Sequence, residues 1–310
     1  MSFTAKDVKE LREATGVGMM DCKKALTESG GDMEKAIDYL RERGLAAAQK
    51  KAGRITAEGV AFADVIDGVG VAVEVNAETD FVAKNDKFID YVKGVLETVA
   101  KTAPADVAAL MAAQYPGSDK TVEQQQQEMI LVIGENISVR RFVRYTDGVS
   151  VPYVHAGGKI GVIVNFDVSG VSNMGAVTEL GKDIAMQIAA MRPLYLDAQS
   201  VDAAELEKEK EIQLTKALEE NKAKNLPEDK SRQIAENIVK GRINKFYEEI
   251  CLLNQPYVKE NKITVEQHVN QVAKELGGQI KINAFTRFEK GEGIEKKEDD
   301  FAAEVAKMVK

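Results

Sequence analysis

Residues 76–85 read NAETDFVAKN, and they lie where two local patterns meet. Before them, valines at positions 71, 73 and 75 alternate with other residues, which is the period-two pattern of a strand with one buried face. After them, apolar residues recur at three- and four-residue steps, as in an amphipathic helix: Phe88, Tyr91, Val92, Val95, Leu96 and Val99. Residues 79–82 are therefore predicted to form a strand-to-helix corner.

This corner allows two interpretations of its aromatic residue. In the first, Asp80 or Asn85 caps the helix, and Phe81 or Val82 packs back onto its first turn. In the second, the corner projects Phe81 outward into a partner, with Asp80 beside it. The local pattern alone favours the first interpretation, because many helices begin in this way.

A resemblance to a known family supports the second interpretation. The run ETDFVAK at 78–84 resembles the Thr-Asp-Phe-Val signature of the translation elongation factor Ts family. Three further segments resemble that family in the same order, namely VKELREATGVGMMDCKKAL at 8–26, IGENISVRR at 133–141 and GEGIEKKEDDFAAEVAKM at 291–308. The resemblance covers nearly the whole chain.

The resemblance implies a nucleotide exchange factor without an active site or cofactor of its own. Its implied partner is elongation factor Tu, in the GDP-bound and nucleotide-free states, whose GDP release it would promote. Phe81 is then expected to insert beside helices of the partner's GTPase domain, while Asp80 disturbs the magnesium side. The residues expected to contact the partner are Thr79, Asp80, Phe81, Val82, Val17, Met19, Met20, Ile133, Gly134, His155, Phe301, Val305 and Met308.

Composition bounds the class of protein. The chain has 310 residues, of which 44% are hydrophobic, so it is expected to be a globular protein with more than one folding unit. Its net charge of -8 argues against direct, sequence-blind binding to nucleic acid, which requires a surplus of Lys and Arg. The local basic clusters at 50–54 and 140–144 are interpreted as solvated faces or as partners of the abundant carboxylates.

Cysteines and terminal sequence bear on the compartment. The only two cysteines, Cys22 and Cys251, are too few for a disulfide framework or a cysteine zinc site. The sequence has no apolar run long enough to cross a membrane, and MSFTAKDVKE lacks the pattern of a signal or transit peptide. A cytoplasmic protein without membrane association is therefore expected.

The fold is predicted to be α+β. Residues 1–54 are expected to form a three-helix module. Thr4, with Asp7 three residues later, is expected to cap the first helix, and Asp32 the third, which is expected to end before Gly44. The resemblance implies a ubiquitin-associated (UBA-like) fold for it. Val17, Met19 and Met20 are expected to be exposed at a glycine-flanked turn, where soft methionine side chains suit an adaptable contact surface. The alternative is that both methionines fill the module's own core.

Two subdomains with antiparallel sheets are predicted to follow, each with a hairpin, a helix and a strand. The first covers residues 55–148, with a hairpin turn at 67–70. After the long helix, which is expected to end near Pro104, a shorter helix is expected over 106–113. A further helix is expected to begin at Thr121 with Gln124 and to end near Gly134, and a strand is expected over 137–145.

The second subdomain combines 149–195 with 251–289, which makes it discontinuous in sequence. A helix in its second segment is expected to begin at Thr264 with Gln267 and to end at Gly277.

Two further elements complete the predicted domain organisation. Residues 202–222 and 228–250 are highly charged with sparse apolar positions. This pattern predicts a protruding antiparallel helical hairpin of the coiled-coil type over 196–250, which could form a homodimer. Residues 290–310 form the C-terminal module, whose short helical tail carries an apolar stripe that needs a groove to bind.

Little in the sequence points to enzyme chemistry. His155 and His268 lack metal-ligand spacing and a neighbouring nucleophile motif. The run HAGGK at 155–159 only partly matches a phosphate-binding loop and is predicted to lie in a hairpin turn. The alternatives to exchange are an adaptor that binds a GTPase without accelerating release, and a hydrolase or transferase, for which the sequence predicts no convergent polar pocket.

Overall fold

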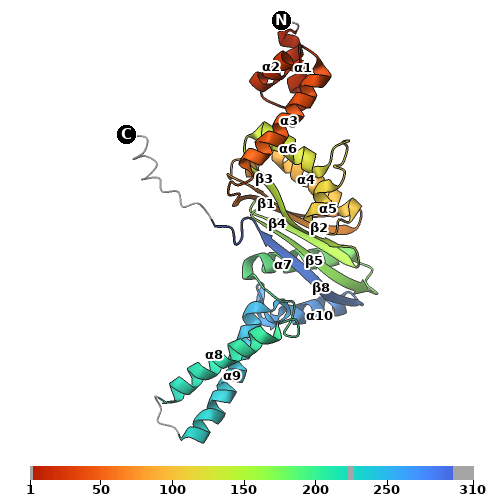
Figure 1. Ribbon diagram of the computed structural model, residues 1–310. Coiled ribbons are helices and arrows are strands. Elements are labelled where there is room, and N and C mark those ends of the chain that lie inside the picture. The colour runs from red at the N-terminus through yellow and green to blue at the C-terminus, as the bar shows by residue number, and fades with distance from the viewer. Residues whose placement is uncertain (1–2, 223–226, 296–310) are drawn as a thin grey trace. The chain divides into compact units, whose positions relative to one another are not determined.

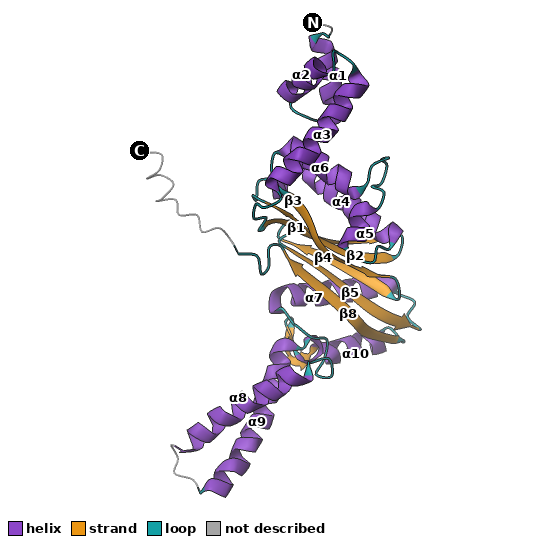
Figure 2. Cartoon of the chain, viewed as in Figure 1, coloured by secondary structure: helices purple, strands orange, loops and turns teal. Residues whose placement is uncertain are grey.

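The computed structural model describes residues 3–222 and 227–295 as a mixed arrangement of helices and three small sheets (Figures 1 and 2). The chain divides into two compact units. Unit 1 comprises residues 1–144, 154–161 and 288–310, and unit 2 comprises 145–153 and 162–287. The predicted α+β class is confirmed at this level.

Unit 1 begins with three helices, α1 (Ala5–Thr15), α2 (Met19–Glu28) and α3 (Met33–Lys51). Thr4 and Asp7 form the predicted capping box of α1, and Asp32 caps α3 by accepting a hydrogen bond from the Lys35 amide. The three helices share a small core made by Val8, Leu11, Val17, Cys22, Ala25, Leu26, Ala36 and Leu40.

The sequence predicted that helix α3 ends before Gly44, but the helix continues through this residue to Lys51. Gly44 thus lies in the middle of the helix, where it is buried. A Cβ atom at Gly44 would lie 3.3 Å from the backbone oxygen of Gln127, in helix α6 (Val122–Ile133). The glycine therefore serves close helix packing, a role that cannot be distinguished from helix termination by local pattern.

Strands β1 (Glu58–Ile66) and β2 (Val69–Ala77) form an antiparallel hairpin. Ile66 pairs with Val69, so the turn contains only Asp67 and Gly68, both at positive φ. This turn is shorter than the predicted one. Strand β3 (Ile137–Tyr145), at the predicted position, completes a sheet of order β1-β2-β3.

Strand β2 is buried on both faces, which corrects the expectation of one buried face. One face packs with α4 (Asp86–Thr102) in the main core of unit 1. On the other face the Glu74 carboxylate accepts hydrogen bonds from Arg140 at 2.9 Å, Arg141 at 2.5 Å and the Gly291 amide at 2.8 Å. Alternation alone missed this because a charged side chain can be buried when cations and amide donors surround it.

The remaining helices of unit 1 lie at or close to their predicted positions. They are α4, the short α5 (Val107–Ala112) and α6, whose N-terminus carries the expected capping box of Thr121 and Gln124. Together with the sheet they enclose a core that includes Val73, Val75, Phe88, Tyr91, Val95, Leu110, Val122 and Ile130.

The second sheet has the order β4-β5-β8, with β4 (Val149–His155), β5 (Ile160–Ser169) and β8 (Gln279–Glu289). Unit 2 also contains α7 (Met174–Met191) and α10 (Val265–Glu275), which begins with the predicted capping box of Thr264 and Gln267. A small sheet of β6 (Pro256–Tyr257) and β7 (Glu260–Thr264) was not predicted, because its strands are too short to show a period.

Helices α8 (Ala203–Lys222) and α9 (Glu228–Ile250) contact each other within unit 2. The Asn221 side chain donates a hydrogen bond to the Ser231 carbonyl, and Arg242 contacts both Gln213 and Glu220. These pairs place the start of one helix beside the end of the other, so the two helices run in opposite directions.

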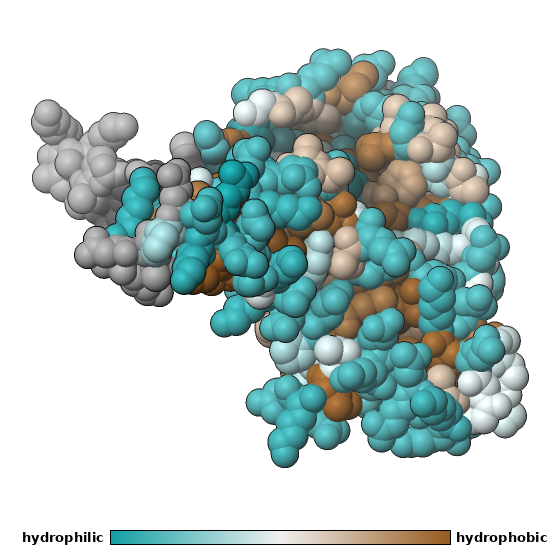
Figure 3. Space-filling view, turned by 90° about the horizontal axis from the view of Figure 1, so that it is seen from below, coloured by the Kyte–Doolittle hydropathy of each residue, from teal (hydrophilic) through white to brown (hydrophobic). Residues whose placement is uncertain are grey.

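The exposed surface is largely polar on the face seen in Figure 3, where hydrophobic residues form smaller areas among hydrophilic ones. Within residues 3–222 and 227–295, no helix combines the length and the apolar character that a membrane span needs.

Candidate functional site

At the corner after β2, two neighbouring apolar side chains, Phe81 and Val82, differ in burial. A short 3-10 turn (η1, Val82–Lys84) precedes α4, which Asn85 caps by accepting a hydrogen bond from the Lys87 amide at 2.9 Å. Val82 is buried in the main core, whereas the Phe81 side chain is 79% exposed. Asn85 and Val82 thus play the local roles that the first interpretation allowed, while Phe81 is directed outward as the second required.

Two hydrogen bonds hold the corner to the turn after α6. Thr79 donates its backbone amide to Glu135 at 3.0 Å and its hydroxyl to the other oxygen of the same carboxylate at 2.7 Å. Because backbone and side chain are bound together, the residue two positions before Phe81 has little conformational freedom.

A reciprocal contact joins the same two segments. The Glu78 carboxylate accepts a hydrogen bond from the Asn136 amide at 2.6 Å, and Arg54 lies within 3.3 Å of the same oxygen. The Asn136 side chain in turn donates to the Arg54 carbonyl at 3.0 Å. Each segment therefore supplies a carboxylate to a backbone amide of the other, which fixes the direction of the corner.

Asp80 lies at the exposed side of this corner. Its carboxylate accepts a charge-assisted hydrogen bond from Lys84 at 2.9 Å, and this bond lowers the pKa of Asp80 below its ordinary value. The carboxylate is thus ionised at neutral pH and accessible to a partner.

The turn between α1 and α2 presents two methionines. Gly16 ends α1 in the left-handed conformation at φ 68°, and its amide donates to the Arg12 carbonyl at 2.8 Å. Met19 is 50% and Met20 is 76% exposed. Val17 is only 4% exposed and belongs to the module's own core. The expectation that Val17 is exposed is therefore wrong, because its side chain fills the space between the three helices.

The methionine turn, the corner and the end of α6 meet at one cleft of about 400 Å³ within unit 1. The Lys87 ammonium donates a hydrogen bond to the Gly16 carbonyl at 3.4 Å, linking α4 to the turn. The cleft is lined by Arg12, Gly16, Val17, Gly18, Phe81, Val82, Asn85, Lys87, Val132 and Ile133. We call this cleft, together with exposed Met19, Met20 and Asp80, the corner surface.

The structure places the other predicted contact residues as follows. Ile133 is half-buried at the end of α6, and Gly134 caps that helix in the left-handed conformation. His155 is exposed as the last residue of β4. Phe301, Val305 and Met308 lie outside the described residues.

The glycines that follow His155 have a structural role. Gly158 adopts φ +97°, and a Cβ atom there would lie 2.9 Å from Cβ of Val60. Its carbonyl accepts a hydrogen bond from the Ala61 amide at 2.8 Å. The partial match of this turn to a phosphate-binding loop is accounted for by close packing against β1.

Sequence reasoning missed the residues that hold the corner, namely Arg54, Glu78, Glu135 and Asn136. Glu78, Glu135 and Asn136 lie inside stretches that resemble the family. No local pattern, however, connects residues this far apart in sequence. Among the described residues, no group of three or more His, Cys, Asp or Glu side chains could hold a metal ion.

Comparison with known proteins decides the family. The family model for "Elongation factor TS" matches residues 78–292, which is more than half of the chain. The chain belongs to the elongation factor Ts family. This membership confirms the resemblance seen in the sequence.

Full-length relatives agree with the elongation factor Ts assignment. The chain is similar to elongation factor Ts of Syntrophotalea carbinolica, with 48% identity over 100% of both chains. It is 51% identical to that of Trichlorobacter lovleyi over 99% of this chain and 98% of the relative, and 49% identical to that of Clostridium perfringens over 99% of each. The elongation factor Ts family implies nucleotide exchange on elongation factor Tu during translation elongation.

Proposed function

We propose that this chain binds elongation factor Tu through the corner surface and promotes GDP release by placing Phe81 and Asp80 near the partner's magnesium and phosphate region. The observation that carries the proposal is an exposed aromatic ring on a corner held by Thr79 and Glu78. The factor would act in the cytoplasm, where translation takes place, and would catalyse no covalent reaction itself.

The exposure of Phe81 provides a driving force for association. Full burial of such a side chain contributes about 1.5–3 kcal/mol. A wedge also has to resist being pushed aside, and the hydrogen bonds from Thr79 to Glu135 provide that resistance. Because the corner is already ordered, little conformational entropy is lost when the ring enters a partner.

Exchange requires preferential binding to the empty partner. A factor that binds the nucleotide-free form more tightly must weaken nucleotide binding by the same ratio. A ten-thousandfold preference corresponds to about 5.5 kcal/mol, more than one phenylalanine supplies. Met19 and Met20 are therefore assigned to anchorage, with Ile133, Gly134, His155 and the tail residues Phe301, Val305 and Met308 as further contacts.

The domain organisation is proposed along the boundaries predicted from the sequence. Residues 1–54 form a UBA-like binding module, and 55–148 and 149–195 with 251–289 form the two subdomains. Residues 196–250 form a separate protruding hairpin that could mediate a homodimer, and 290–310 form a C-terminal binding module. The opposite directions of α8 and α9 support the hairpin.

The release of fluorescently labelled GDP from elongation factor Tu tests the proposal. Wild-type chain is expected to accelerate release, and Phe81→Ala is expected to slow the accelerated rate by about tenfold or more, as loss of a central interface side chain does. Leu194→Ala is the matched control, because Leu194 is 66% exposed but lies in unit 2. Equal release by wild type and Phe81→Ala would remove the wedge from the mechanism.

The same experiment separates exchange from adaptor binding. An adaptor would form a complex with elongation factor Tu that is detectable by calorimetry, yet would leave the rate of GDP release at its spontaneous value. Acceleration that saturates with factor concentration supports the exchange role.

A further inference from the structure

Helix α3 contributes to two hydrophobic cores of unit 1. Its first half supplies Ala36 and Leu40 to the core of the three-helix module. Its second half places Ala47 and Ala48 against the main core, to which Val82 of the corner also belongs. One continuous helix therefore connects the segment bearing Met19 and Met20 to the segment bearing Phe81.

Helix α6 has the same double role. Met129 and Ile130 belong to the main core, whereas Leu131 and Val132 pack against the core of the three-helix module. Two helices are thus shared between two cores, so any shift of α3 along α6 would move the methionines relative to Phe81.

Helices α3 and α6 approach each other closely at Gly44. A Cβ atom there would lie 3.3 Å from the carbonyl oxygen and 3.5 Å from the carbonyl carbon of Gln127. Glycine inside a helix is less stable than alanine by about 0.5–1 kcal/mol. The position thus has a cost in helix stability that close contact with α6 accounts for.

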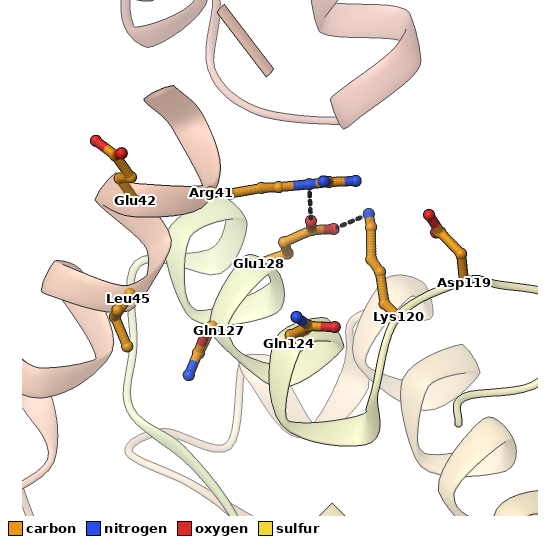
Figure 4. Close-up of a pocket in the computed structure, with 8 residues that line it drawn as sticks. All are labelled: Arg41, Glu42, Leu45, Asp119, Lys120, Gln124, Gln127 and Glu128. Carbon is orange, nitrogen blue, oxygen red and sulfur yellow. Dashed lines mark hydrogen bonds and ion pairs between the residues drawn. The ribbon is translucent and has the colours of Figure 1, made fainter. Parts of the chain in front are cut away.

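Polar contacts fix the same crossing (Figure 4). Glu128, on α6, contacts Arg41 of α3 at 4.0 Å and Lys120 at 2.5 Å, and Figure 4 marks both contacts with dashed lines. These residues line a pocket of about 340 Å³ beside the contact. Because Arg41 is half-exposed, its pair with Glu128 adds little stability by itself, but it opposes sliding of the helices.

We propose that Gly44 is a positioning residue that sets the distance between the Met19-Met20 turn and Phe81, so that both engage one partner at once. This inference rests on the proposed function. It assigns no partner contact to Gly44, which is buried beneath α6. Simultaneous engagement matters because the second contact then forms at a high effective concentration.

A distance measurement tests the positioning itself. Spin labels on Lys24→Cys and Lys93→Cys, both exposed, report the separation of α2 and α4 by double electron–electron resonance, while buried Cys22 and Cys251 remain unlabelled. Wild type is expected to give one narrow distribution, and Gly44→Leu a shifted or broadened one. Gly241→Leu is the matched control, since Gly241 is inside α9 with nothing within 4 Å of a Cβ atom. An unchanged distribution in Gly44→Leu would overturn the proposal.

A double-mutant cycle tests the consequence for binding. Met20→Ala is expected to weaken binding to nucleotide-free elongation factor Tu by about fivefold in the wild-type background. In the Gly44→Leu background the same change is expected to cost less than about twofold, because the methionine is already displaced. Equal costs in both backgrounds would overturn the proposal. Gly44→Ala, which requires a shift of only a few tenths of an ångström, serves as the milder variant if Gly44→Leu does not fold.

The two proposals fail in different ways. If Phe81→Ala accelerates GDP release as much as wild type does, the proposed wedge role is lost. The spin-label distances would still report whether Gly44 sets the distance between the Met19-Met20 turn and Phe81. If the distances do not change, the positioning role is lost while the wedge stands.

Discussion

The hydroxyl of Thr79 donates a hydrogen bond of 2.7 Å to Glu135, fifty-six residues later in the chain. This contact, with the backbone bond from Thr79 to the same carboxylate, ties the corner before α4 to the turn after α6. It explains how Phe81 can be exposed on a segment that is nevertheless fixed. The exposed ring and its fixed support come from different parts of the sequence.

Removal of the carboxylate at this contact should loosen the corner. Glu135→Ala leaves the partly buried Thr79 amide without its acceptor, which costs about 1–3 kcal/mol locally. We expect faster hydrogen exchange in a peptide covering 77–84 and a lower rate of GDP release from elongation factor Tu. Glu123→Ala, which removes an exposed acid from helix α6 itself, should change neither measurement. Unchanged exchange at the corner in Glu135→Ala would contradict the proposed support.

The buried carboxylate of Glu74 should be among the costliest side chains to change. Glu74→Gln leaves Arg140 and Arg141 without their shared anion, and breaking such a cluster destabilises a protein by about 3–5 kcal/mol when it is fully buried. Both arginines are about one third exposed, so the lower end, about 3 kcal/mol, is expected in urea unfolding. Glu10→Gln, in an exposed pair with Lys6, should cost under about 0.5 kcal/mol.

Truncation of Val17 should lower stability, whereas truncation of Met20 should lower affinity for the partner. Val17→Ala removes two buried methyl groups from the three-helix core and should lower the free energy of unfolding by about 2 kcal/mol. Met20→Ala removes exposed atoms, so stability should change by less than about 0.5 kcal/mol while affinity for elongation factor Tu falls. Urea titration and calorimetry measure the two quantities. Stability loss in Met20→Ala equal to that in Val17→Ala would contradict this division.

Burial of Cys251 makes stability depend on pH in the alkaline range. Burial raises the pKa of its thiol from 9.0 to about 11. The unfolded chain therefore loses this proton at lower pH than the folded chain, so the stabilisation is fully present below about pH 9 and is lost as pH rises toward 11. Between pH 9 and 10 the loss is about 1 kcal/mol, below the maximal slope of about 1.4 kcal/mol per pH unit because the unfolded thiol is only half ionised at pH 9.

Urea unfolding of wild type and Cys251→Ala at pH 8, 9 and 10 measures this dependence. The wild-type free energy of unfolding should fall more steeply with pH than that of the variant. Parallel slopes would exclude Cys251 as the source. Buried tyrosines also titrate above this range, since the pKa of Tyr257 is raised to about 12, mainly by burial, so the comparison stops at pH 10.

Local elements of the fold could be predicted from the sequence because their signals are local. Capping boxes at Thr4, Thr121 and Thr264 and the stripe of α4 each depend on residues within a few turns. The corner after β2 was predicted for the same reason. The exposure of Phe81 was not, because a phenylalanine beside a helix start satisfies either direction, and only the resemblance favoured the outward one.

The features that could not be predicted from the sequence are those that depend on residues distant in the chain. Gly44 has the sequence appearance of a helix end, but its role is set by Gln127 on another helix. Glu74 alternates with valines as a surface residue would, yet it is buried with Arg140 and Arg141. The contacts of Thr79 with Glu135 likewise join segments that no pattern relates.

The most direct test of the wedge is the ratio of two dissociation constants. The affinity of the chain for nucleotide-free elongation factor Tu is compared with its affinity for the GDP-bound form, in wild type and in Phe81→Ala. The account predicts that Phe81→Ala weakens binding to the nucleotide-free form more than to the GDP-bound form, so that the ratio falls by about tenfold or more, equivalent to about 1.4 kcal/mol of lost coupling. An equal loss of affinity for both forms would mean that Phe81 only anchors the complex, and this would contradict its role as the wedge.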